Sequence, residues 1–228
     1  MRILAIESSS KPASVAICED GELISMLFQR SGLTHSRTLL PMAQDVLKNL
    51  EMTIGDVNLI AVAHGPGSFT GIRIGISAAM GLSWGADVPV VGVSTLEAMA
   101  YQVETEDCTI CPVLDARRGQ IYNAKFARRG GQLERLCPDR AISLEELARE
   151  ESAASSPLLL IGDGAELCAD FLSQKAVGFT LAPALSRYQT AFGVALAAQN
   201  SDISADNSVM PNYIRLSQAE RLLKGEKD

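Results

Sequence analysis

The chain has 228 residues, of which 47% are hydrophobic and 21% charged, a balance typical of a globular protein that excludes an intrinsically disordered one. Its net charge of −7 and its pI near 5.0 disfavour stand-alone binding to nucleic acid, because such binding depends mainly on Lys and Arg that displace counterions from phosphates. The apolar run after Arg2 ends at Glu7, too short for a signal-peptide core or a membrane span. We therefore expect a cytoplasmic protein that does not associate with membranes.

The first hundred residues alternate between strand and helix patterns. Apolar runs predict strands at 2–6, 13–18 and 22–28, with Asp20-Gly21 as a hairpin turn between the last two. A helix capped by Ser36 and running to Leu50 follows. Next come a strand at 59–63, a helix at 71–85, a strand at 90–93 and a helix at 94–102. This rhythm predicts βαβ crossovers, and therefore an α/β lobe over residues 1–100.

The pattern restarts near Tyr101. It predicts strands at 109–114, 121–126, 133–136 and 158–161, and helices at 143–151, 165–174 and 190–199. Ser143 and Glu146 have the spacing of a capping box at the start of the first of these helices. We expect a second α/β lobe over residues 101–210 and a tail, residues 211–228, that returns across the first lobe.

Five cysteines are an odd number in a chain without an export signal, which favours reduced thiols over a disulfide framework. Cys108 and Cys111 form a CxxC pair inside a predicted strand, where residues three apart point to opposite faces. No second Cys or His pair accompanies them. We therefore expect plain buried thiols rather than a zinc or redox site.

A glycine-rich segment, His-Gly-Pro-Gly-Ser-Phe-Thr-Gly-Ile-Arg-Ile-Gly at 64–75, feeds the predicted helix at 71–85. Such a loop can present main-chain N–H groups to an anion at a helix N-terminus, or it can simply form a tight turn. The segment lacks the Lys-Ser/Thr of a P-loop and the context of a dinucleotide fingerprint. Taken alone, the pattern favours the tight turn.

The helix at 71–85 carries large apolar residues around its whole circumference, with small residues between them. A helix that is apolar all round is normally covered on both sides. It is therefore either the central helix of one core or part of a surface that a partner covers, and periodicity does not decide between the two.

Two segments at the start of the chain, Ile-Leu-Ala-Ile-Glu-Ser-Ser-Ser at 3–10 and Ala-Ser-Val-Ala-Ile at 13–17, resemble the opening hairpin of the actin, sugar kinase and Hsp70 ATPase superfamily. The core Gly-Pro-Gly-Ser-Phe-Thr-Gly-Ile-Arg-Ile-Gly and the segments at 88–98, 115–122 and 211–215 are similar to the TsaB family. The resemblance implies an α/β, actin-like (ribonuclease H-like) duplicated fold, with two lobes whose mixed sheets are flanked by helices.

The resemblance also implies a function. TsaB-family proteins are the non-catalytic subunits of the bacterial tRNA threonylcarbamoyladenosine synthase, whose catalytic subunit TsaD transfers threonylcarbamoyl to N6 of the adenosine next to the anticodon, in tRNAs reading codons that begin with A. By this resemblance the chain pairs with TsaD and with the ATPase TsaE, forms a homodimer when alone, and meets tRNA only through the complex.

The same comparison implies a degenerate nucleotide and metal site without a metal, cofactor or catalytic residue. TsaD carries a His-x-x-x-His metal pair where this chain has Thr95 and Met99, and a hydroxyl and a thioether are weak ligands for a hard divalent ion. The segment 115–119 stands where active relatives have a glycine-rich phosphate loop, and only two glycines of the adenosine segment remain. The residues assigned to this site are Glu7, Ser8, Thr95, Met99, Asp115, Gly162 and Gly164.

The helices at 37–50 and 71–85 are expected to lie side by side and to form a common surface that a second pair of helices covers. Because TsaD resembles this chain in the same lobe, the surface is expected to pair with a second copy or with TsaD. The residues predicted for this partner interface are Leu39, Met42, Ala43, Val46, Gly71, Ile72, Gly75, Ala78, Ala79 and Leu82.

Two other functions stay open from the residues alone. The chain could be an independent small-molecule kinase or carbamoyltransferase of the same fold, with Glu7 or Asp115 as acid or base. It could instead bind tRNA directly through arginines that could equally form a solvated strand edge. These arginines are Arg117, Arg118, Arg128 and Arg129.

Overall fold

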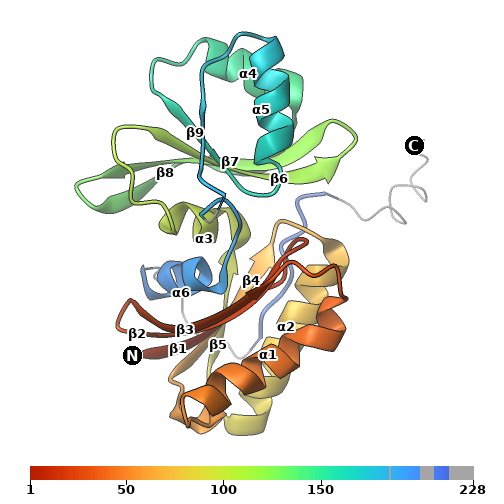
Figure 1. Cartoon of the computed structure of the whole chain (residues 1–228), viewed down its shortest axis with the longest axis vertical. Coiled ribbons are helices and arrows are strands. Elements are labelled where there is room, and N and C mark those ends of the chain that lie inside the picture. Colours follow the sequence, from red (N-terminus) through yellow and green to blue (C-terminus); the bar gives the residue numbers. More distant parts are fainter. Residues whose placement is uncertain (185, 201–207, 216–228) are drawn as a thin grey trace.

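The computed structural model describes residues 1–184, 186–200 and 208–215, and it has two lobes, each built on a five-stranded sheet (Figure 1). The first sheet has the order β3-β2-β1-β4-β5. β1 pairs antiparallel with β2 and parallel with β4, so the sheet is mixed. Its strands are β1 (Arg2–Glu7), β2 (Ala13–Glu19), β3 (Glu22–Gln29), β4 (Leu59–Gly65) and β5 (Val90–Ser94).

The second sheet repeats this arrangement with the order β8-β7-β6-β9-β10. β6 pairs antiparallel with β7 and parallel with β9, as β1 does with β2 and β4. The strands are β6 (Thr109–Arg117), β7 (Gln120–Arg129), β8 (Gln132–Ser143), β9 (Leu158–Ile161) and β10 (Thr180–Leu181). The predicted duplicated α/β fold with two mixed sheets is confirmed.

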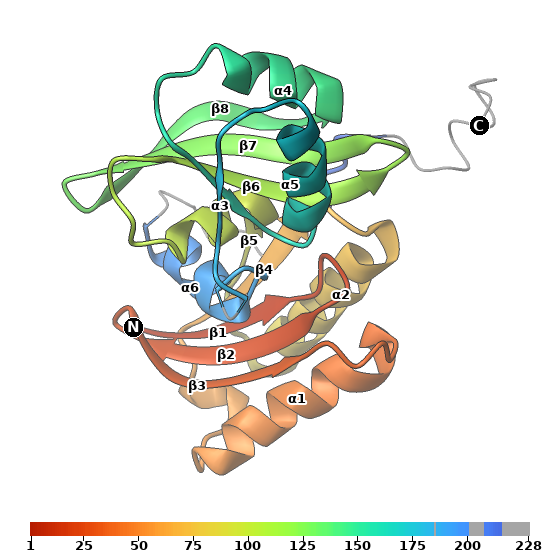
Figure 2. The same cartoon turned by 45° about the horizontal axis from the view of Figure 1, so that its top comes forward.

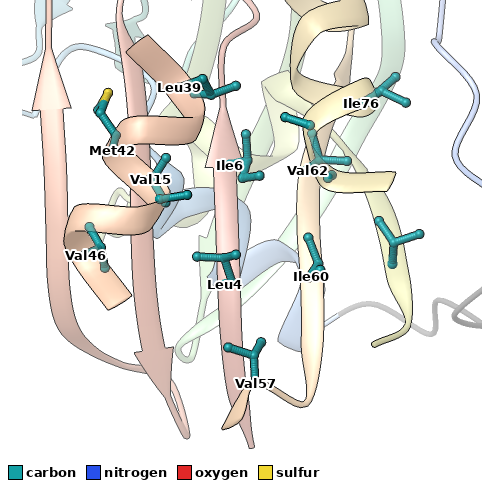
Figure 3. Packing of buried hydrophobic residues seen from close by; sticks show 14 of the residues in the cluster. Leu4, Ile6, Val15, Leu39, Met42, Val46, Val57, Ile60, Val62 and Ile76 are labelled. Atoms are coloured by element: carbon teal, nitrogen blue, oxygen red, sulfur yellow. The ribbon is translucent and has the colours of Figure 1, made fainter. Parts of the chain in front are cut away.

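Two helices, α1 (His35–Asn49) and α2 (Phe69–Ala86), lie side by side on one face of the first sheet, as predicted. Leu39 and Val46 of α1 and Ile76 of α2 pack there against Ile6 of β1 and Val62 of β4 (Figure 3). A short 3-10 helix, η1 (Ile54–Asp56), precedes β4. In the second lobe, α4 (Leu144–Ser152) and α5 (Ala165–Gln174) cover the corresponding face.

Two further helices, α3 (Thr95–Tyr101) and α6 (Ala191–Asn200), lie between the sheets (Figures 1 and 2). α3 ends the first half of the chain but packs largely on the second sheet, with Leu96 and Met99 in one cluster with Phe126 of β7. α6 ends the second half but packs on the first sheet, against residues such as Ile3 and Ala16. The predicted second lobe, residues 101–210, therefore does not match the packing, because α6 lies within this range but covers the first sheet.

The described part of the tail, residues 208–215, contacts the first lobe. Val209 is buried in the same cluster as the α1 and α2 core residues. The main-chain N–H of Asn212 donates a 2.8 Å hydrogen bond to the carbonyl of His64, near the end of β4. The polar stretch at 201–207 and the rest of the tail, 216–228, lie outside the described residues.

Several local expectations differ from the structure. α1 begins at His35 after Thr34, not at a Ser36 cap. β8 extends to Ser143, well past the expected 133–136, because its backbone keeps pairing with β7 as far as Gln120. Ser143 does cap α4 by accepting a 3.0 Å hydrogen bond from the Glu146 N–H.

The cysteines and the apolar character of the helices were two further subjects of the sequence analysis. All five cysteines are free; Cys111 is buried, whereas Cys108 precedes β6 and is partly exposed. In the part of the chain that the structure describes, no helix has the length and apolar character needed to cross a bilayer.

Candidate functional site

A cleft of about 560 Å³ opens between the two lobes. Its walls are the turn between β1 and β2, the start of α2, the ends of β6 and β9, and the tail. Charged side chains of both signs line it, among them Lys11, Asp115, Arg117, Asp163 and Arg215. Of the seven residues that the sequence assigned to a degenerate nucleotide and metal site, only Asp115 lines this cleft.

Glu7 lies below the floor of this cleft, at the end of β1, and is completely buried. Its Oε1 accepts hydrogen bonds from the main-chain N–H of Ser9 at 2.6 Å and from the Ser9 hydroxyl at 2.5 Å. Its Oε2 has no hydrogen-bond partner among the described residues. Burial raises the pKa of this carboxyl to about 7, with a further contribution from the charge of Asp163.

Asp163 faces Glu7 from the second lobe, in the turn after β9. Its Oδ2 accepts a hydrogen bond from the hydroxyl of Ser10 in the first lobe, so this contact joins the lobes at the base of the cleft. Burial raises the pKa of Asp163. The sequence analysis did not select Asp163, although its place between two glycines after a buried strand is a signal that could have found it.

The two predicted glycines beside Asp163 serve packing. Gly162 has a φ of +111°, and a Cβ there would lie 2.1 Å from the carbonyl oxygen of Val113. A Cβ on Gly164 would lie 2.9 Å from the main-chain nitrogen of Asp115. Both positions therefore need glycine whether or not a nucleotide binds nearby.

The remaining predicted residues of this site divide into two groups. Asp115 lines the cleft, and Ser8 lies buried beneath it, where its hydroxyl donates a 3.0 Å hydrogen bond to the carbonyl of Gly71. Thr95 and Met99 are both fully buried in α3 and do not line the cleft. The structure therefore does not bring these two residues together with Asp115 and Glu7 around one cavity.

The glycine-rich loop before α2 packs tightly against the β1–β2 turn. The N–H of Ser68 donates a 2.6 Å hydrogen bond to the carbonyl of Ser9, and a Cβ on Gly67 would lie 2.3 Å from that oxygen. The Ser68 hydroxyl caps α2 by accepting from the Gly71 N–H at 3.3 Å. This geometry accounts for the glycines as a close-packed turn at the edge of the cleft.

A second concave surface is a groove of about 350 Å³ between α1 and α2 on their outer side. Leu40, which is 44% exposed, forms part of it. Trp84 lies further along α2 and is 71% exposed. The groove is lined by His35, Ser36, Leu39, Leu40, Arg73, Ile74, Ser77 and Ala78.

Most residues predicted for the partner interface lie instead in the core of the first lobe. Val46, Ile72 and Ala79 are 0% exposed, and Met42 and Ala43 are buried beside them. For the α2 residues, the physical reason is that large apolar side chains surround the helix, so its periodicity could not tell the inner side from the outer one. The α1 residues belong to the apolar stripe that packs against the sheet of their own lobe. Of the predicted residues, only Leu39 and Ala78 line the groove, and Leu82 is partly buried.

The small residues at the start of α2 also have a different role from the one expected. A Cβ on Gly71 would lie 2.1 Å from the carbonyl oxygen of Ser8, and one on Gly75 would lie 2.4 Å from its hydroxyl oxygen. These glycines therefore let α2 approach the β1–β2 turn of its own lobe, rather than a partner helix. The sequence analysis missed Leu40, an apolar residue on the solvent side of the α1 stripe that could have marked the groove.

The four arginines of the tRNA-binding alternative do not form one surface. Arg117 lines the cleft, and Arg117 and Arg118 have positive φ angles of 64° and 58° in the β6–β7 turn. Arg128 donates hydrogen bonds to the carbonyls of Val103 and Gly131, and Arg129 pairs with a glutamate of β8. Arg128 therefore stabilises the fold of the second lobe.

Comparison of the sequence with known families gives a match over residues 29–223 to the model described as TsaD, tRNA N6-adenosine threonylcarbamoyltransferase. The chain is 31% identical over 224 residues to the tRNA threonylcarbamoyladenosine biosynthesis protein TsaB of Bacillus subtilis, covering 96% of each sequence. It is 41% identical over 130 residues to the TsaB protein of Escherichia coli, covering 56% of each.

Solved structures agree with the fold. A Pseudomonas aeruginosa protein described as similar to peptidase YEAZ matches with a TM-score of 0.78 at 24% identity, over 94% of this chain and 99% of that one. YeaZ from Pseudomonas aeruginosa matches with a TM-score of 0.70 at 25% identity, over 87% and 91%. At 12% identity, the ethanolamine utilization protein EutJ of Carboxydothermus hydrogenoformans, with a TM-score of 0.55, shares the fold alone.

Proposed function

The chain belongs to the TsaB family and takes part in tRNA threonylcarbamoyladenosine biosynthesis, and we propose that it does so as a non-catalytic subunit that docks onto a TsaD-type catalytic subunit. In this proposal the chain positions and activates its partner, while the partner transfers the threonylcarbamoyl group.

The observation that carries the proposal is the environment of Thr95 and Met99. In the catalytic relatives, as the sequence resemblance implies, the corresponding positions hold the imidazoles of a metal pair. Here Met99 packs among Leu96, Phe126 and other apolar residues, and the Thr95 side chain is fully buried at the start of α3. Neither side chain faces the cleft, so the two cannot supply metal chemistry there.

The α1–α2 groove is the surface that best supports docking. An exposed leucine, a partly buried isoleucine and small side chains form a concave apolar strip between two helices, a shape that suits ridges of a second helix pair. We propose that Leu40, Ile74 and Ser77 contact the partner. The buried residues first predicted for this surface support it from beneath.

Leu40→Arg tests the docking surface, because Leu40 lines the groove and is already 44% exposed, so the monomer should stay folded. Leu136→Arg on β8 is a matched control, since Leu136 is also 44% exposed but lies in the other lobe. We expect Leu40→Arg to weaken binding to purified TsaD from the same organism at least tenfold and to lower threonylcarbamoyladenosine formation in a reconstituted assay. Equal binding by both variants, measured by calorimetry, would place docking elsewhere.

The same reasoning extends to the other partners. We propose that a second copy of the chain covers the groove when the catalytic subunit is absent, so that homodimer and heterodimer compete for it. By the same family resemblance, we propose that the ATPase TsaE joins the complex and that tRNA binds only to the assembled complex. The net charge of −7 supports this last point, because the isolated chain repels a phosphate backbone.

The alternative, an independent kinase or carbamoyltransferase, has less support if Glu7 is its acid or base, whereas Asp115, the other candidate, does line the cleft. A general base must reach the proton that it abstracts, whereas Glu7 lies fully buried beneath the cleft and already accepts two hydrogen bonds from Ser9. Turnover of threonine, bicarbonate and ATP by the isolated chain would revive this alternative.

A further inference from the structure

The tail is anchored to α2 by a stack of side chains. The ring of Tyr213 stacks on that of Phe69 with centroids 4.5 Å apart, and the Arg73 guanidinium lies 3.8 Å from the centroid of the Phe69 ring. Arg73 Nε also donates a 2.7 Å hydrogen bond to the Tyr213 hydroxyl. We call residues 208–215 the strap, and this stack is one of its anchors.

The strap crosses from the first lobe to the second. Beyond Tyr213, the guanidinium of Arg215 donates a 2.7 Å hydrogen bond to the carbonyl of Ala116 at the end of β6. Residues 212–215 line the cleft, so the strap forms one of its walls. Releasing either anchor would therefore loosen the wall of the cleft and one of the contacts between the lobes.

Arg73 belongs to two structures at once, because it lines the α1–α2 groove and holds Tyr213. We propose that docking in the groove and anchoring of the strap through Tyr213 and Arg215 are coupled through Arg73. A partner surface over Arg73 excludes water from the stack, and the attraction between a guanidinium and an aromatic ring is stronger when both are desolvated. Docking then favours the anchored strap, and by linkage the anchored strap favours docking. This inference rests on the proposed docking function.

Arg215→Ala tests the coupling, because Arg215 anchors the strap on the second lobe and does not line the groove. A direct contact with the partner at the groove is thus preserved while the far anchor is removed. We expect the affinity for purified TsaD to fall by about two- to fivefold, the size of a weak allosteric coupling. The control is Arg149→Ala on α4, which removes an exposed arginine far from the strap in the fold and should leave the affinity unchanged.

Hydrogen–deuterium exchange on the full chain gives the reciprocal measurement. Saturating TsaD should slow exchange of the strap amides, including the Asn212 N–H that bonds to His64, in the wild type. In Arg215→Ala this protection should be smaller, while protection of the groove residues on α1 persists.

The outcomes separate the two ideas. If TsaD protects the groove, but the affinity for TsaD and the protection of the strap amides are the same in Arg215→Ala as in the wild type, the coupling is wrong and the docking function stands. If TsaD does not protect the groove in the wild type, the docking function itself fails, and the coupling fails with it.

Discussion

The carboxylate of Glu7 accepts two hydrogen bonds from Ser9, one from the main-chain N–H at 2.6 Å and one from the hydroxyl at 2.5 Å, while its other oxygen has no partner among the described residues. The two bonds favour the charged form, but complete burial outweighs them and raises the pKa of Glu7 to about 7. The proton on Glu7 therefore contributes to stability.

The pH dependence of stability should reveal this proton. Because the pKa of Glu7 is higher in the folded chain than its ordinary value of 4.5, its contribution is complete below about pH 4.5 and is lost as the pH rises to about 7. The loss amounts to about 3 kcal/mol. Glu7→Gln, which mimics the protonated acid, should remove this part of the slope. Urea unfolding at several pH values measures this slope. If the free energy of unfolding fell equally with pH in the wild type and in Glu7→Gln, the prediction would be wrong.

Glu150 should act in the opposite direction. It accepts hydrogen bonds from both Nη atoms of Arg140 and from Lys125, and these partners lower the pKa of Glu150 to about 2. Its contribution is therefore present above its ordinary pKa of 4.5 and is lost as the pH falls to about 2. Glu150→Gln should destabilise the chain at pH 7 but little at pH 2. Glu145→Gln, at an exposed position on α4, is the control. If both variants lowered the melting temperature at pH 7 by the same amount, the prediction would be wrong.

Substitutions on α2 should distinguish its inner and outer sides. Ala79 is 0% exposed in the core of the first lobe, so Ala79→Arg buries an unpaired charge and should destabilise the monomer by about 3 kcal/mol or more. Ser77→Arg, on the exposed side of the same helix, should change stability by less than about 0.5 kcal/mol and affect only docking. Denaturant unfolding of both variants decides, since similar midpoints would mean that the two sides are not distinct.

Two glycines of α2 offer another matched pair. Gly71→Ala places a methyl group 2.1 Å from the carbonyl oxygen of Ser8, which is backbone, and should cost about 1–3 kcal/mol. At Gly81 nothing lies within 4 Å of an added Cβ, so Gly81→Ala should stabilise the helix by about 0.5–1 kcal/mol. The two substitutions should change the free energy of unfolding in opposite directions. If Gly71→Ala left it unchanged, α2 would be able to move away from β1.

The sequence by itself determined the elements and their repetition. Apolar runs and the Asp20-Gly21 turn predicted the β2–β3 hairpin, and the βαβ rhythm predicted parallel pairing in the first lobe. These features are local, since each depends on spacing within one or two elements. The side-by-side arrangement of α1 and α2 was also predicted, from the apolar surfaces of the two helices, and the structure has it.

Only the tertiary structure decided which surfaces these elements bury. Periodicity could not orient α2, because its apolar residues surround the helix, and the approach of Gly71 to Ser8 fixes its inner side. Packing also placed α6 on the first sheet and sealed Met99 in a core with Phe126. Such contacts join residues distant in the sequence, and their energies depend on the whole arrangement, so no local pattern records them.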